Sequence, residues 1–211
     1  NCNDDAFRTA AATLKAREKE YPTRAEVIRW VETQYLVFSN CAGRRAIPEP
    51  LDVDSSSTLA LADRAYQIAA AHFYAGDFDD AAAGFRAIAA DRASPWQPIA
   101  GYLEARALVR KGLLAHPDGR DVPALEQALK VLKAQRAARP DDVRLQRLQS
   151  YARLRARPAE EAHARATAFL QSLDRPDLHD AFTDFAFALE NPVPAEVSTA
   201  AHDLSDWVCV M

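Results

Sequence analysis

Apolar residues recur every three or four positions along most of the chain, which is the spacing of one face of an α-helix. Residues 3–21 (NDDAFRTAAATLKAREKEY) and 24–40 (RAEVIRWVETQYLVFSN) follow this pattern on either side of Pro22, which interrupts a helix. We predict that residues 1–41 form a helical hairpin. Residues 42–57 include two prolines and show no periodicity, so we expect a surface loop there.

A helix–turn–helix unit is predicted next. The first helix should span Thr58–Ala75, with Ser57 or Thr58 as its N-cap and Gly76 closing it. Asp77 is expected to cap the second helix, where Asp79 and Asp80 lie in the first turn. Its buried stripe is expected to comprise Ala81, Phe85 and Ile88. These elements make up one helical pair.

The first helix of this pair recurs 36 residues further along the chain. Its matched residues are Tyr66, Ala69, Ala71 and Gly76, followed by Tyr102, Ala105, Ala107 and Gly112. A period in the mid-thirties indicates helical pairs that bury their apolar faces by stacking on one another. We predict a second pair from residues 96–112 and 123–138, and a third, weaker one over 143–173. The fold class is therefore predicted to be all-α.

Residues 66–91 (YQIAAAHFYAGDFDDAAAGFRAIAAD) resemble a tetratricopeptide repeat. Ala69 matches the family's small residue in the first helix, and Gly76-Asp77-Phe78 match its turn. Ala81 and Phe85 match the small and aromatic positions of its second helix. In the second pair, Ala128 matches the family's small position, Leu132 its large position and Pro140 its terminal proline. The departures are His72 at an aromatic position, Ile88 at an alanine position, an insertion at 113–122 and Arg157 at a glycine position.

The resemblance covers residues 62–173, about half of the chain, and weakens towards the end of that range. It implies a right-handed α-α superhelix over residues 58–173, here preceded by the hairpin. Residues 174–211 are expected to form C-terminal helices, one over 178–190 with Leu178, Phe182, Phe185 and Leu189 at helical spacing, and a second over 195–210. Because the chain ends on an apolar run, we expect the natural protein to continue beyond Met211, and its start at Asn1 indicates a processed or cut form.

Repeats of this family usually present the first helix of each pair to a concave surface. The resemblance therefore implies a peptide- or partner-binding face that comprises Tyr66, Gln67, Tyr102, Arg106 and Arg110. An extended peptide or an acidic C-terminus would be held there by arginine charge and glutamine hydrogen bonds. The alternative is that these aromatic residues pack between helices.

Two of the three cysteines lie at matching distances from Pro22. Cys2 is 20 residues before it and Cys41 is 19 residues after it. At about 1.5 Å per residue, both reach the open end of the hairpin, where they can form a disulfide. A loop of about 40 residues closed in this way contributes roughly 4 kcal/mol. Such a bond favours a periplasmic or secreted protein, whereas two free thiols in a cytoplasmic protein are the alternative. Cys209 is interpreted as a small apolar residue.

Charge is distributed unevenly along the chain, although the net charge is only −4. Residues 130–165 carry 10 Lys and Arg against 4 acids, whereas residues 174–211 carry 8 acids against Arg175 alone. The basic stretch can bind an anionic ligand or lipid, or it can be a solvated helix surface. Nucleic acid is not an expected partner, because the net charge is negative and no aromatic residues are interleaved with the basic ones.

No catalytic, phosphate-binding or dinucleotide-binding motif occurs in the sequence. Paired carboxylates stand at helix starts, where capping and the helix dipole account for them. The group His179, Asp177, Asp180 and Asp184 is a poor metal-ligand set. We therefore expect no enzyme activity, no metal and no cofactor, and the sequence has no apolar stretch long enough to span a bilayer.

The leading functional hypothesis is a non-enzymatic helical-repeat scaffold, extracytoplasmic in a bacterium-like setting, that binds a protein or peptide on its concave face. One alternative is an accessory helical domain of a larger cell-envelope enzyme, such as one that cleaves the cell wall. Another is binding of an anionic ligand through the basic stretch. The sequence does not specify the partner or the oligomeric state.

Overall fold

The computed structural model describes residues 4–114, 120–171 and 178–190. Every regular element among them is a helix, which confirms the predicted all-α class. The chain divides into two compact units, residues 1–141 and residues 142–211. None of the described helices has the length and apolar character needed to cross a bilayer.

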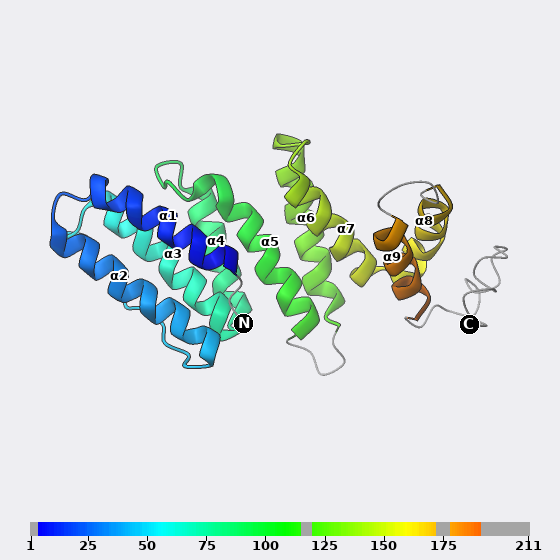
Figure 1. Ribbon diagram of the computed structural model, residues 1–211, viewed down its shortest axis with the longest axis horizontal. Helices are drawn as coiled ribbons and strands as arrows, with labels where there is room; N and C mark the ends of the chain where they lie inside the picture. Colours follow the sequence, from blue (N-terminus) through cyan, green and yellow to red (C-terminus); the bar gives the residue numbers. More distant parts are fainter. Residues whose placement is uncertain (1–3, 115–119, 172–177, 191–211) are drawn as a thin grey trace. The chain divides into compact units, whose positions relative to one another are not determined.

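The first unit is built from helices that pack in the order of the sequence. They are α1 (Asp4–Glu20), α2 (Arg24–Ser39), a 3-10 helix (Asn40–Ala42), α3 (Thr58–Ala75), α4 (Phe78–Ala90), α5 (Gln97–Leu114) and α6 (Val122–Ala138). From α1 to α6, consecutive α-helices pack against each other (Figure 1). Helices that are neighbours in sequence are thus neighbours in space within this unit.

The predicted start and end of α3 are confirmed. The Ser57 side chain accepts a hydrogen bond from the backbone N–H of Ala60 at 3.2 Å, so it caps the helix. Gly76 ends the helix with a φ of 89°, a left-handed conformation that costs other residues energy. α1 and α2 also lie within their predicted ranges, and Thr23 caps α2.

The predicted cap of α4 is wrong in one respect. Asp77 occupies the N-cap position, but its side chain makes no hydrogen bond to the helix. Its carboxylate instead accepts a hydrogen bond from Arg45 and lies 3.5 Å from Nδ1 of His72. Asp77 therefore ties the 42–57 loop to the end of α3, which is a long-range contact that helix-capping rules do not consider.

α3 and α4 approach closely, as the pattern of small residues predicts. Ala81, Phe85 and Ile88 are 0%, 2% and 5% exposed, so the predicted stripe of α4 is buried. A Cβ added to Gly84 would lie 2.9 Å from Cβ of Ala69, which is too close for an unstrained contact. The absence of a side chain at Gly84 allows the two helices to meet at this distance.

Among the repeated residues, the alanines have the same degree of burial, whereas the glycines differ. The alanine pairs Ala69/Ala105 and Ala71/Ala107 are all buried. Gly112, unlike Gly76, lies inside its helix, because α5 continues to Leu114. The insertion replaces the tight turn of the first pair, and the backbone N–H of Asp121 donates to the carbonyl of Gly112 across it at 2.7 Å.

The second unit contains α7 (Val143–Ala156), α8 (Pro158–Gln171) and α9 (Leu178–Glu190). α7 packs against α8, and α8 packs against α9. Phe185 is fully buried and its ring stacks on that of Phe169, with centroids 6.0 Å apart. Phe182, which has the same helical spacing, is 39% exposed. The helix predicted over residues 195–210 lies outside the described residues.

Candidate ligand-binding pocket

The first unit contains a pocket of about 170 Å³ whose walls come from α1, α2, α3, α4, α5 and the segment before α5. Its α5 wall includes Tyr102, Arg106 and Arg110, which are four residues apart and so lie along one face of that helix. Its α3 wall includes Tyr66, Ala70, Phe73 and Tyr74, which also share one face. The duplicated tyrosines therefore line the same pocket.

α1 supplies a wall of a different kind. The side chains that it contributes are small or polar: Asp5, Ala6, Thr9, Ala10 and Thr13. α2 adds Trp30, Gln34, Val37 and Phe38. Because α1 presents no large side chain to the aromatic faces of α3 and α5, a space remains between them.

Aromatic rings form the base of the pocket. Tyr66 stacks on Trp96 with ring centroids 3.8 Å apart and planes 13° apart, and its edge meets Phe85 at 6.1 Å. Phe73 makes an edge contact with Tyr74 at 5.4 Å. Stacked and edge-to-face rings of this kind hold one another in fixed orientations. The base of the pocket is consequently rigid and apolar.

Two arginines share the face of one ring at the side of the pocket. The guanidinium carbons of Arg106 and Arg110 lie 5.5 and 4.9 Å from the ring centroid of Phe73, and Arg106 lies 5.7 Å from that of Tyr102. Both arginines are half-buried. Within the described part of the chain, neither forms an ion pair or a hydrogen bond.

The electrostatics of the pocket are consequently unbalanced. Burial and the neighbouring charge of Arg106 both lower the pKa of Arg110. The one acid among the lining residues is Asp5, which is exposed. Two positive charges next to an apolar cavity, with a single exposed negative charge in the lining, favour an anion in the pocket.

Two tyrosine hydroxyl groups also have no hydrogen-bond partner among the residues that the structure describes: those of Tyr66 and Tyr74. Burial raises the pKa of Tyr66 to about 12 and also raises that of Tyr74. Both hydroxyls therefore stay protonated at neutral pH and are available to donate a hydrogen bond to a ligand.

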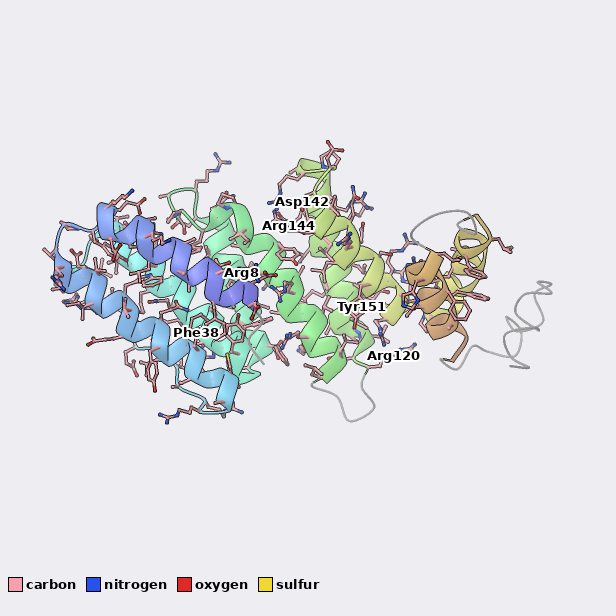
Figure 2. All side chains as sticks on the ribbon, in the orientation of Figure 1. Arg8, Phe38, Arg120, Asp142, Arg144 and Tyr151 are labelled. Carbon is pink, nitrogen blue, oxygen red and sulfur yellow. The ribbon has the colours of Figure 1, made fainter. Side chains whose placement is uncertain are left out.

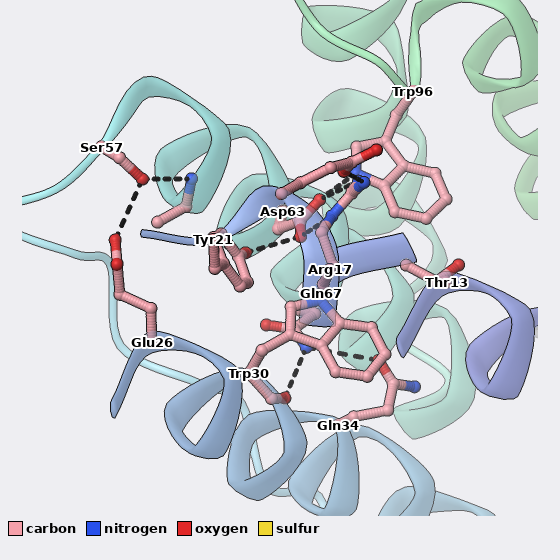
Figure 3. A network of polar contacts seen from close by, with 12 residues as sticks. Thr13, Arg17, Tyr21, Glu26, Trp30, Gln34, Ser57, Asp63, Gln67 and Trp96 are labelled. Atoms are coloured by element: carbon pink, nitrogen blue, oxygen red, sulfur yellow. Dashed lines mark hydrogen bonds and ion pairs between the residues drawn. The ribbon is translucent and has the colours of Figure 1, made fainter. Parts of the chain in front are cut away.

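Gln67, which was predicted to belong to the binding face, does not line this pocket. It is 2% exposed, and its side-chain amide donates to the carbonyl of Trp30 at 3.1 Å and to Oε1 of Gln34 at 3.3 Å (Figure 3). One residue along a helix rotates a side chain by about 100°, so Gln67 points away from the face that Tyr66 shares. It links α3 to α2.

A buried polar network that the sequence analysis did not predict holds α1 against α3 and the segment before α5. Asp63 is 1% exposed and accepts hydrogen bonds from Arg17 Nε at 2.6 Å and Nη2 at 2.8 Å, from Tyr21 Oη at 2.7 Å and from Trp96 Nε1 at 2.8 Å. Figure 3 shows these groups converging on its carboxylate. The network joins α1, α3 and the segment before α5. The signal in the sequence is an aspartate at an otherwise apolar helix position.

Of the two cysteines in the predicted disulfide, Cys2 lies outside the described residues. Cys41 lies in the 3-10 helix after α2. The ring centroids of Phe7, near the start of α1, and Phe38, near the end of α2, are 4.4 Å apart; Figure 2 labels Phe38. The open end of the hairpin therefore brings the two helices together, while the Cys2–Cys41 bond itself stays a prediction.

The basic stretch of residues 130–165 contains several paired charges. In the second unit, Glu161 is 6% exposed and lies 2.6 Å from Arg153 Nη2 and 3.1 Å from Arg165 Nη2. Asp142 pairs with Arg144 at 2.9 Å, at the start of α7 (Figure 2). These pairs favour the second interpretation of the basic stretch, a solvated helix surface. In the group around His179, Asp177 and the side chains of Asp180 and Asp184 lie outside the described residues.

Comparisons with protein-family models, with curated proteins and with solved structures found no match to this chain.

Proposed function

We propose that this chain is a non-enzymatic helical-repeat scaffold that binds a protein or peptide partner at the pocket on α3 and α5. The observation that carries the proposal is the Arg106–Arg110 pair, because two half-buried guanidinium groups without an acidic partner stand beside an apolar cavity. Binding sites commonly combine an apolar cavity with a few convergent polar groups.

The order of the helices supports the tetratricopeptide-like part of the proposal. In the first unit each helix packs against the next, and the repeated alanines are buried at equivalent places. A right-handed superhelix would present the first helix of each pair, α3 and α5, on its inner surface. Tyr66, Tyr102, Arg106 and Arg110 then form the partner-binding set, and Gln67 has a supporting role.

The basic stretch is a weaker candidate for the binding site than the α5 arginines. Glu161 and Asp142 neutralise several of its charges at close range. Arg139, in the first unit, donates to the carbonyl of Pro98 at 2.6 Å. Charged groups that are already paired offer less to a ligand than unpaired ones.

An extracytoplasmic location is part of the proposal, and it rests on the Cys2–Cys41 disulfide. The Phe7–Phe38 contact supports that bond, because these residues are five and three positions from the two cysteines. Disulfides persist in oxidising compartments.

A photo-crosslinking experiment tests the proposed function. Thr9 is exposed at the α1 wall of the pocket, so p-benzoylphenylalanine at this position would reach a bound partner. Ala87, an exposed position on α4 that does not line the pocket, is the matched control. We expect a crosslinked partner in native extract from position 9 and none from position 87. Equal labelling from the two positions would refute a specific face.

A further inference from the structure

The size of the pocket limits what can enter it. Its volume of about 170 Å³ is close to that of a cavity of about 150 Å³ that holds a benzene molecule in another protein. A single ring or a short branched alkyl group therefore fits, whereas a long acyl chain would extend into solvent. The rings of Phe73, Tyr66 and Trp96 line the pocket and offer apolar contacts to such a group.

The charges limit the polar part of the ligand. Arg106 and Arg110 contribute two positive charges, and Asp5 at the rim contributes one negative charge. The net charge of the lining is thus +1, which one negative charge neutralises. A carboxylate also matches the planar fork of a guanidinium group with two parallel hydrogen bonds.

We propose that this pocket binds a ring-sized apolar group that carries a single carboxylate, with the apolar group against Phe73 and Trp96 and the carboxylate held by Arg106 and Arg110. The Tyr66 and Tyr74 hydroxyls, which lack partners among the described residues, are the additional donors. This inference rests on the proposed function and specifies what the partner presents. The same chemistry can come from the C-terminal residue of a peptide or from a free aromatic acid.

Calorimetric titration of the purified full chain tests the inference. The probes are 3-phenylpropionate, its neutral counterpart 3-phenylpropan-1-ol, and an acetylated tetrapeptide Gly-Ser-Gly-Phe with either a free carboxylate or a C-terminal amide. We expect the carboxylate form of at least one pair to bind at least about tenfold more tightly than its neutral counterpart, because a charge-assisted hydrogen bond is lost in the latter. Preference for the peptide or for the free acid identifies the source of the group.

A double variant locates the binding to the pocket. In R106Q/R110Q, the carboxylate form is expected to bind no more tightly than the neutral form. R24Q/R92Q is the matched control, because Arg24 and Arg92 are exposed, lie in the same unit and form no interaction in the described structure. It should bind as the wild type does, and the unfolding transition of each variant shows whether it is folded.

Several results would overturn the inference: no binding of any probe, equal binding of acids and neutral counterparts, or unchanged binding in R106Q/R110Q. Tighter binding of phenyl phosphate than of 3-phenylpropionate would contradict a singly charged ligand. The proposed function survives these outcomes if position 9 still crosslinks a partner. If the probes bind but no partner is crosslinked, the proposed function fails and the inference about the pocket's ligand stands.

Discussion

At the scale of single residues, Asp63 determines how α1 is held against the rest of the first unit. Its carboxylate is 1% exposed and accepts hydrogen bonds from three side chains that are far from it in sequence. Arg17, its charged partner, is 6% exposed and also pairs with Glu20. A buried ion pair of this kind is costly to break, because removal of one partner leaves the other buried and uncompensated.

The first prediction concerns this carboxylate. The substitution Asp63→Ala is expected to lower the free energy of unfolding by about 3–5 kcal/mol, because Arg17 loses both of its hydrogen bonds to the buried carboxylate. Urea denaturation measures this loss. Glu32→Ala, at an exposed position of α2, should change stability by less than about 0.5 kcal/mol. A loss below about 1 kcal/mol for Asp63→Ala would show that the network contributes little.

The second prediction concerns stability at alkaline pH. Tyr66 has a pKa of about 12 in the folded protein, and an unfolded tyrosine has a pKa of about 10. Between these values the unfolded chain releases a proton that the folded chain keeps, so stability contributed by Tyr66 is present below about pH 10 and is lost as pH rises towards 12. Tyr21 and Tyr74 have raised pKa values as well and act in the same direction.

The substitution Tyr66→Phe removes one of these groups. It should make the fall in the free energy of unfolding between pH 10 and 12 shallower by up to about 1.4 kcal/mol per pH unit. Urea denaturation at several pH values measures the slope. Tyr35→Phe is the control, because Tyr35 is 65% exposed. The same slope for Tyr66→Phe as for the wild type would contradict the raised pKa of Tyr66.

At the scale of elements, the pattern predicts helices well and long-range polar contacts poorly. The ranges of α1 to α4 and the cap and closing glycine of α3 follow from local rules, because each depends on residues a few positions apart. Asp77 departs from its predicted role because Arg45, 32 residues away, competes for its carboxylate. Gly112 does not end its helix as Gly76 does, because the inserted segment after it removes the need for a tight turn.

The third prediction concerns the contact between α3 and α4. Gly84→Val should lower the free energy of unfolding by about 1–3 kcal/mol, because its Cβ would lie 2.9 Å from Cβ of Ala69 and neither helix backbone can yield easily. Thermal or urea denaturation measures the change. Ala83→Val, at the neighbouring exposed position, should have a much smaller effect. Equal effects of the two substitutions would indicate that the helices are not in close contact.

The fourth prediction concerns the hairpin of α1 and α2. Intact mass measured without reductant should be about 2 Da below that of the reduced chain, and peptide mapping should join Cys2 to Cys41. Removal of the bond by C2S/C41S should cost about 4 kcal/mol, as expected for a closed loop of about 40 residues. If Cys2 and Cys41 both react with an alkylating agent without reduction, the extracytoplasmic location loses its support.

At the scale of the whole molecule, each compact unit has its own set of packed helices, and the candidate site belongs to the first. The repeat period predicts that Tyr66 and Tyr102 share a face, and both line one pocket. The period says nothing about α1, which is not part of a repeat, so the wall formed by Thr9 and Thr13 could not be predicted. The network around Asp63 was also missed, because its members come from three separate segments.

The fifth prediction tests the central claim, that the face of α3 and α5 next to α1 binds a partner. The measurement is the yield of partner crosslinked through position 9 in native extract, compared between the wild type, R106E/R110E and R24E/R92E. Reversal of two charges at the pocket should reduce the yield at least about tenfold, because both charge-assisted contacts become repulsive. The surface control, with the same change in net charge, should keep the yield of the wild type. Equal yields from folded R106E/R110E and from the wild type would contradict the account.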